Sequence, residues 1–145
     1  MIKGTLIHPQ ILSVLGTAGH GATILIADGN YPFVTGANPA AERVYLNLAP
    51  GILNATDILQ AILSVTEVEA AHVMSRHDGE EPSIFSDFRD LLPDGMGLTP
   101  LERFDFYDEA KKDNCCMVIA TAEQRIYANI LLTIGVVTPP ANKLI

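Results

Sequence analysis

Two kinds of apolar segment alternate along the chain. In one kind, apolar residues recur every three or four positions, which is typical of a helix with one buried face. In the other kind, short runs of β-branched and other apolar residues are bounded by Gly, Pro, Asn or Asp, which is typical of buried strands. The pattern predicts helices at 9–17, 54–64, 83–91 and 99–112, strands at 22–28, 44–48, 68–74 and 117–121, and an apolar segment of unsettled type at 127–135.

Helices that alternate with short buried strands predict an α/β domain, with a central sheet of short buried strands flanked by helices. Thr99 and Pro100 are read as the cap and first turn of the last helix, because proline is favoured in the first turn of a helix. One domain is predicted for residues 1–138. Pro139 and Pro140 end it, which leaves 139–145 as a tail.

Composition narrows the class of protein. The chain has 145 residues, of which 48% are hydrophobic and 18% charged, so it is long and apolar enough for one full core. A net charge of −8 argues against nucleic acid as a partner, because phosphate binding needs clustered Lys and Arg. No secretory signal or membrane span is recognised, so we expect a soluble, cytoplasmic protein without a membrane partner. The adjacent Cys115 and Cys116 are read as core filling.

The tripeptide Gly19-His20-Gly21 is the sharpest local candidate for chemistry. Glycines on both sides permit positive φ and leave the ring open to a ligand. Histidine as a residue type titrates closest to neutral pH, which suits proton transfer in either direction. The alternative is a helix C-terminus at which the glycines end the helix and the ring faces water.

Asp28 ends the apolar run 22–28, where a carboxylate must be exposed, paired or part of a site. Ligands of open α/β sheets gather outside the carboxyl ends of strands, which favours a site. The alternative is a turn-forming Asp in the segment Asp28-Gly29-Asn30. Sequence does not decide between the two.

Two further groups offer hydrogen-bonding side chains, and the first also offers aromatic surface for stacking a sugar. Arg103 lies beside Phe104, Phe106 and Tyr107 in the segment RFDFY, although a helix that buries its aromatics and exposes its Arg is the commoner arrangement. Tyr127 and Asn129 lie two residues apart, so their side chains face the same side if the chain is extended.

Motifs for metals, nucleotides and acyl transfer are missing. His8, His72 and His77 have no recognised zinc spacing, and neither HExxH nor CxxC is present. No GxGxxG follows a strand, and GxxxxGK[ST] and GxSxG are absent. Motifs alone therefore predict a soluble α/β domain without a metal or cofactor.

Three segments read in order resemble the signature segments of the ribose pyranase and fucose mutarotase family, RbsD/FucU. They are GHGATILIADGNYP, RFDFYDEAKK and YANILLTIGVV, and the resemblance extends from about Ile7 to Val137. It implies an RbsD-like single domain and a cofactor-free isomerase that interconverts sugar anomers. It also implies a homo-oligomer, a decameric ring whose sites lie at subunit interfaces.

The same resemblance assigns roles to residues. The family's catalytic His falls on His20 as proton donor and its sugar-binding Asp on Asp28, with orientation of the imidazole as a further role for Asp28. Its Tyr-x-Asn pair falls on Tyr127 and Asn129. Arg103 stands where fucose mutarotases have Arg and the ribose branch tends to have His, which favours L-fucose.

Tyr107 or Tyr31 is expected to pack on the apolar face of the sugar. Two departures from the family pattern bear on specificity: Ala22-Thr23 replaces an acidic pair, and Gly29-Asn30-Tyr31 replaces a small residue followed by an apolar one. Two other readings stay open at this point. They are a D-ribose pyranase, and a non-catalytic sugar-binding or regulatory subunit.

Overall fold

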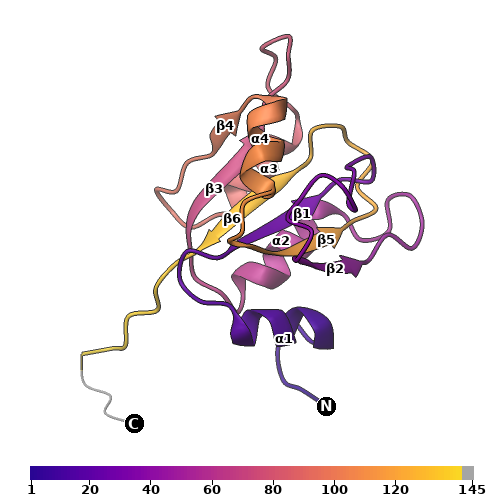
Figure 1. The fold of residues 1–145 in the computed structure, drawn as a ribbon. Helices are drawn as coiled ribbons and strands as arrows, with labels where there is room; N and C mark the ends of the chain where they lie inside the picture. The colour runs from indigo at the N-terminus through magenta and orange to yellow at the C-terminus, as the bar shows by residue number, and fades with distance from the viewer. Residues whose placement is uncertain (142–145) are drawn as a thin grey trace.

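Four helices and six strands are present among residues 1–141, the residues that the computed structural model describes. The strands form one sheet of order β2-β5-β1-β6-β3-β4, in which β6 is antiparallel to both its neighbours and the other pairs are parallel (Figure 1). The elements are α1 (Pro9–Thr17), β1 (Thr23–Ala27), β2 (Glu42–Tyr45), α2 (Ala55–Leu63), β3 (Val68–Met74), α3 (Ile84–Leu91), β4 (Thr99–Leu101), α4 (Arg103–Ala110), β5 (Cys115–Ala120) and β6 (Ile130–Ile134).

This topology gives the sheet two chemically different ends. Strands β1 to β5 all finish at one end, where β6 begins, and we call this the carboxyl end of the sheet. The opposite end, where β1 begins, is the amino end. Because β1 has five residues at about 3.3 Å each, the two ends lie about 16 Å apart.

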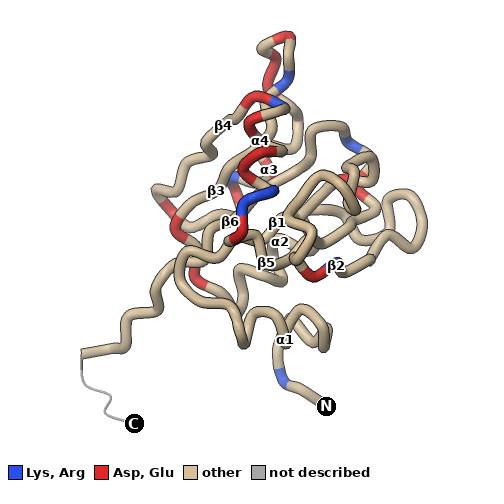
Figure 2. Tube along the Cα trace, in the orientation of Figure 1, with Lys and Arg blue, Asp and Glu red and all other residues tan. Residues whose placement is uncertain are grey.

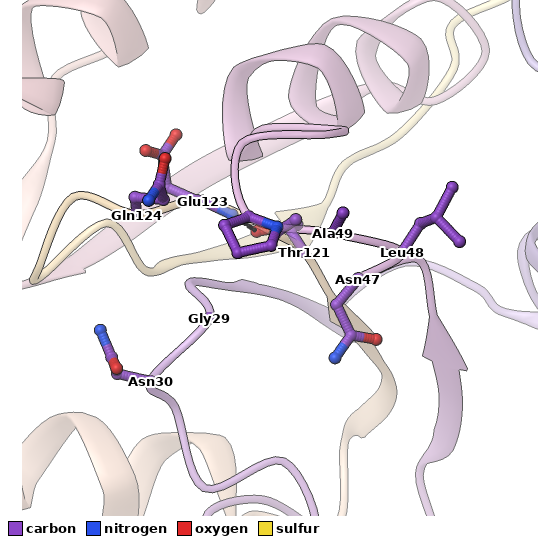
Figure 3. A pocket seen from close by; sticks show the side chains of 10 residues that line it. Gly29, Asn30, Asn47, Leu48, Ala49, Thr121, Glu123 and Gln124 are labelled. Carbon is purple, nitrogen blue, oxygen red and sulfur yellow. Dashed lines mark hydrogen bonds between the residues drawn. The ribbon is translucent and has the colours of Figure 1, made fainter.

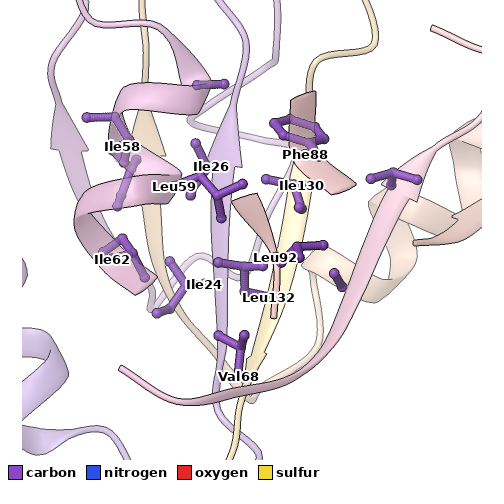
Figure 4. Packing of buried hydrophobic residues seen from close by; sticks show 14 of the residues in the cluster. Ile24, Ile26, Ile58, Leu59, Ile62, Val68, Phe88, Leu92, Ile130 and Leu132 are labelled. Atoms are coloured by element: carbon purple, nitrogen blue, oxygen red, sulfur yellow. The ribbon is translucent and has the colours of Figure 1, made fainter. Parts of the chain in front are cut away.

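The core occupies both faces of the sheet, because successive strand side chains point to opposite faces. Ile24 and Ile26 of β1 pack with residues of α2 and α3 (Figure 4), and Ile11 of α1 belongs to the same cluster. Leu25 and Ala27 pack on the other face with Phe106 of α4 and with residues of the loop that follows β1. Burial on both faces explains why β1 is a continuous apolar run rather than an alternating one.

The α/β class and the helices near 9–17, 54–64 and 83–91 are confirmed. His8 caps the first helix, since its Nδ1 accepts from the Ile11 N–H at 3.4 Å. The second predicted strand is present but ends at Tyr45, because its partner β5 ends at Ala120. The unsettled segment 127–135 contains a strand, β6.

The predicted helix start at Thr99 and Pro100 is wrong. These residues form β4, where Pro100 is in register with Val73 of β3, and the helix begins only at Arg103. Strand β4 is the outermost strand, so the missing N–H of proline leaves no ladder partner unsatisfied. Pairing of β4 with β3 therefore outweighs the local sequence preference for a helix start at Thr99 and Pro100.

Both cysteines are free, with Cys115 buried and Cys116 half-buried in β5. Burial raises the pKa of each thiol, so both stay protonated at neutral pH, as core filling requires. Within residues 1–141, no helix has the length and apolar character needed to cross a bilayer. The last four residues of the predicted tail 139–145 lie outside the described residues.

Figure 2 shows the charged residues along the trace. Lys and Arg lie singly or in small groups among Asp and Glu, and over the described residues they gather into no continuous basic stripe. Several charges form surface ion pairs, such as the one between Arg89 and Glu81 at 2.6 Å. Such exposed pairs contribute little to stability.

Candidate active site

A hollow of about 440 Å³ lies at the carboxyl end of the sheet. Its walls come from the ends of β1, β3 and β6 and from the first turns of α4, segments that are distant in sequence. Every residue assigned to sugar binding from the sequence lines it. The lining residues are Asp28, Asn30, Tyr31, Met74, Arg103, Tyr107, Ile126, Tyr127 and Asn129.

Asp28 and Asn129, which both line this hollow, form reciprocal hydrogen bonds. The Asp28 N–H donates to Asn129 Oδ1 at 2.8 Å, and Asn129 Nδ2 donates back to Asp28 Oδ2 at 3.0 Å. The N–H groups of Ala128 and Asn30 also donate to this carboxylate, at 3.1 and 2.9 Å. Both side chains are thereby fixed in orientation, and each keeps unused hydrogen-bonding capacity for a ligand hydroxyl.

The environment of Asp28 opposes its charge. Burial raises its pKa above the ordinary value of 3.8, and the hydrogen bonds from Asn30, Ala128 and Asn129 lower it again only in part. Only 3% of the residue is exposed. A carboxylate with so little solvent around it is a strong acceptor for a sugar hydroxyl, because a hydrogen bond is electrostatically stronger where the local dielectric constant is low.

Arg103 and Tyr127 form the polar wall. Arg103 Nη2 donates to the Tyr127 hydroxyl at 3.0 Å. Tyr127 has a φ of 62°, a left-handed conformation that is unusual for a bulky residue. A tight turn, rather than the extended chain considered from the sequence, therefore brings Tyr127 and Asn129 to the same hollow.

Tyr31 and Tyr107 form the apolar wall, with ring centroids 5.4 Å apart. Tyr31 is buried, and its hydroxyl donates to the Gly36 carbonyl at 2.6 Å. Burial raises the pKa of Tyr31 far above its ordinary value. Tyr31 thus holds the loop in place, whereas the half-buried Tyr107 is the ring available to a ligand.

His20 lies at the amino end of the sheet, in the turn between α1 and β1, and is not part of this hollow. Its side chain is 58% exposed, and its Nε2 lies 2.9 Å from Glu69 Oε2. Within one chain Asp28 therefore does not orient the imidazole, because β1 separates the two residues by about 16 Å. The contact of the imidazole is instead with Glu69 of β3, which sequence reasoning missed.

His77 is a second residue that sequence reasoning missed. It lies in the polar loop 75–82, yet its Nδ1 is 3.5 Å from the Tyr127 hydroxyl. The local sequence gives no sign of this contact. The available signal was topological, because the loop follows β3, whose carboxyl end faces the same hollow.

A neighbouring hollow of about 420 Å³ lies on the other side of Asn30 (Figure 3). Its Thr121 hydroxyl donates to the Ala27 carbonyl at 2.8 Å, and its Glu123 is bound to Arg125 at 3.0 Å. The side chains left for a ligand are mainly the carboxamides of Asn30, Asn47 and Gln124. It lacks an acid or base free for proton transfer.

Across residues 1–141, no group of three or more His, Cys, Asp and Glu is arranged to hold a metal ion.

Comparison with known proteins places this chain in a family. A family model described as the RbsD / FucU transport protein family matches residues 1–137. The chain belongs to the RbsD/FucU family. The family resemblance carried by the three sequence segments is thus confirmed.

Individual RbsD/FucU relatives align with this chain over nearly its whole length. A D-ribose pyranase from Clostridium perfringens is 31% identical, over 94% of this chain and 99% of its own. A fucose mutarotase from Danio rerio is 33% identical, over 96% of both chains. The crystal structure of the Streptococcus pneumoniae fucose mutarotase in complex with L-fucose is 31% identical, has a TM-score of 0.76, and is matched over 91% of this chain and 95% of its own.

Proposed function

We propose that this protein is a cofactor-independent sugar mutarotase that interconverts the α and β anomers of L-fucose or a related monosaccharide. The observation that carries the proposal is the hollow at the carboxyl end of the sheet. It combines a buried carboxylate, a carboxamide, a guanidinium and an aromatic wall, which is the set of groups that a neutral polyol needs. Relatives named fucose mutarotase and D-ribose pyranase support the same chemistry.

Mutarotation requires two proton transfers. The anomeric hydroxyl loses a proton while the ring oxygen gains one, and the opened aldehyde then rotates and closes on its other face. Each positioned acid or base typically contributes about 10²–10⁴-fold. The reaction also proceeds slowly in water, so one acid and one base beside a firmly held sugar are sufficient.

We assign proton exchange to His20 and sugar binding to the residues of the hollow. Asp28 and Asn129 accept from and donate to sugar hydroxyls, and Arg103 donates with the N–H groups that Tyr127 does not use. Tyr107 packs on the apolar face of the ring, and Tyr127 supplies a hydroxyl. All of these groups act on a neutral substrate, which the acidic chain does not repel.

The site is proposed to be completed by a second copy of the chain. His20 and Asp28 lie at opposite ends of β1, about 16 Å apart, too far for one bound monosaccharide to reach both. A ring of subunits brings the amino end of one copy to the carboxyl end of the next. We propose the decameric ring implied by the family resemblance as this assembly, with His20 donated across the interface.

Exchange spectroscopy tests the proposed activity. With L-fucose, D-ribose and D-galactose in turn, we expect saturation-transfer NMR to show faster anomer exchange of L-fucose when the protein is added. Arg103 in the hollow supports fucose as the preferred sugar. Pyranose–furanose exchange of ribose with little response to fucose would instead support the second candidate, a D-ribose pyranase, which the Clostridium perfringens relative favours.

A third outcome would contradict both enzyme assignments. If the protein binds one of these sugars, measured by calorimetry, yet accelerates no exchange, it is a sugar-binding or regulatory subunit. Buffer-catalysed exchange sets the background, so a heat-denatured sample of the same protein is the control.

Mixing two inactive variants tests whether the site is shared between copies. We expect His20→Ala and Asp28→Ala each to lose activity alone, and a co-refolded equal mixture to regain about a quarter of the wild-type rate, because random assembly pairs an intact His20 with an intact Asp28 at that frequency. The measurement is anomer exchange at equal total protein. A mixture as inactive as its components would show that both residues must come from the same chain.

A further inference from the structure

Tyr127 has a hydroxyl held between two side chains that come from different elements. Arg103 at the start of α4 donates to the hydroxyl oxygen at 3.0 Å, and His77 in the loop after β3 presents Nδ1 at 3.5 Å. Neither neighbour is adjacent to Tyr127 in the sequence. The contact thus depends on the fold and joins three of the segments that surround the hollow.

The direction of these hydrogen bonds follows from what each group can do. A guanidinium has no acceptor, so Arg103 must donate and the Tyr127 oxygen must accept. The Tyr127 hydrogen is then free to point to His77 Nδ1, which accepts it in the tautomer protonated at Nε2. The Tyr127 hydroxyl therefore accepts a hydrogen bond from Arg103 and donates one to the unprotonated Nδ1 of His77.

The position of His77 is fixed although its loop is exposed. On one side, the Ser75 N–H and hydroxyl both donate to the Leu101 carbonyl, at 2.8 and 2.9 Å, which ties the loop to β4. Around His77 itself, Arg76 Nε donates to Asp78 Oδ1 at 2.9 Å and so closes a tight bend. Tyr127 is held in its left-handed conformation, a strain that persists at functional positions when the surroundings enforce it.

We propose that His77 is a positioning residue for the mutarotase reaction, one that orients the Tyr127 hydroxyl, takes up its proton during ring opening and returns it on closure. This inference rests on the proposed function and adds to it a base of the same chain that contacts Tyr127 in the wall of the hollow, complementary to the His20 proposed to come from a neighbouring copy. Exposure of His77 suits this task, because water stabilises the charged imidazolium that forms when the ring takes up the proton.

The proton transfers of ring opening and ring closure balance over one turnover. During ring opening the anomeric O–H bond breaks, its proton goes to the Tyr127 oxygen, and the Tyr127 hydrogen passes to His77 Nδ1. The electron pair of that O–H bond forms the aldehyde C=O, while the C1–O5 bond breaks and O5 takes a proton from His20 of the neighbouring copy. Ring closure on the other face reverses each transfer and restores both histidines.

Two substitutions of the full-length protein separate orientation from proton exchange. In His77→Ala both roles are lost, whereas His77→Asn keeps an oxygen acceptor near the position of Nδ1 but cannot take up a proton. We expect both variants to lower kcat for anomer exchange by about 10²-fold, the lower end for an acid–base group, with KM close to wild type. Added imidazole should restore exchange to His77→Ala and not to Tyr127→Phe.

Glu81→Gln is the matched control, because Glu81 lies in the same loop and among the described residues its carboxylate accepts hydrogen bonds only from Arg89, at 2.7 and 2.6 Å. It should keep the wild-type rate. A wild-type kcat in His77→Ala overturns the inference, as does a loss that imidazole does not relieve or that appears in KM alone.

A measurement independent of turnover distinguishes this inference from the proposed function. The ¹⁵N resonance of His77 Nδ1 should move in Tyr127→Phe, and an unchanged resonance overturns the inference even in an active enzyme. A wild-type protein that accelerates no exchange of any sugar overturns the proposed function itself and the relay with it, whatever the resonance shows.

Discussion

The His20→Ala variant is expected to fold normally and to lose anomer exchange by about 10²–10⁴-fold, the range for one positioned acid–base group. Normal folding is expected because the side chain is 58% exposed and its hydrogen bond to Glu69 is on the surface. Saturation-transfer NMR measures the exchange, and circular dichroism with a thermal melt reports on the fold.

His8→Ala is the control histidine variant. It removes the cap of α1, which costs about 1 kcal/mol of stability, but His8 lies outside the proposed site and the exchange rate should hold. Unchanged exchange in His20→Ala would remove His20 from the mechanism and direct attention to the groups of the hollow.

The Asp28→Asn variant is expected to bind sugar about 10–100-fold more weakly, because hydrogen bonds to a charged group contribute about 1.5–3 kcal/mol. The carboxamide can accept with only one of its two heavy atoms. Its NH₂ group would face either the Asn30 or the Ala128 N–H, both of which donate to the carboxylate in the wild type. Calorimetry with the preferred sugar measures the loss, and wild-type affinity in this variant would exclude Asp28 from the binding site.

The same variant should change how stability depends on pH. Because burial raises the pKa of Asp28 in the folded state above 3.8, the folded protein binds this proton more readily than the unfolded chain. The contribution of Asp28 to the free energy of unfolding is therefore most favourable below pH 3.8 and falls as pH rises through the folded pKa.

Asn does not titrate, so the free energy of unfolding of the variant relative to wild type should increase over the same pH window and then level off. Urea unfolding at a series of pH values, from acid to neutral, measures the difference. Parallel curves for the two proteins would show that the folded pKa of Asp28 is not raised.

The local pattern of apolar residues was sufficient to predict most of the helices and strands. Helix periodicity and the continuous β-branched runs depend on which faces are buried, and these patterns located α1, α2, α3 and the central strands. Thr99-Pro100 was misread because the decisive partner, β3, lies more than twenty residues earlier in the chain, and only the assembled sheet supplies it. Segment 127–135 stayed unsettled because a short apolar run fits a buried helix or a strand equally well.

The residues of the candidate site could be predicted to lie together because each stands in a recognisable segment, and the fold brings those segments to one hollow. Glu69 and His77 could not, since each matters only through a partner that the tertiary structure places beside it, His20 in one case and Tyr127 in the other. The separation of His20 from Asp28 was equally invisible, because eight residues of sequence give no distance until the segment between them is known to be extended.

A rigid strand between His20 and Asp28, the residues proposed for proton exchange and sugar binding, has a consequence for how activity would depend on protein concentration. Strand β1 is hydrogen-bonded on both sides, so no hinge within one chain can bring its two ends together. If the two halves of each site meet only between copies, dilution below the dissociation constant of the assembly switches the enzyme off without unfolding it. The specific rate of exchange should then fall on dilution, while sugar that is already bound to the hollow of a single subunit stays unconverted.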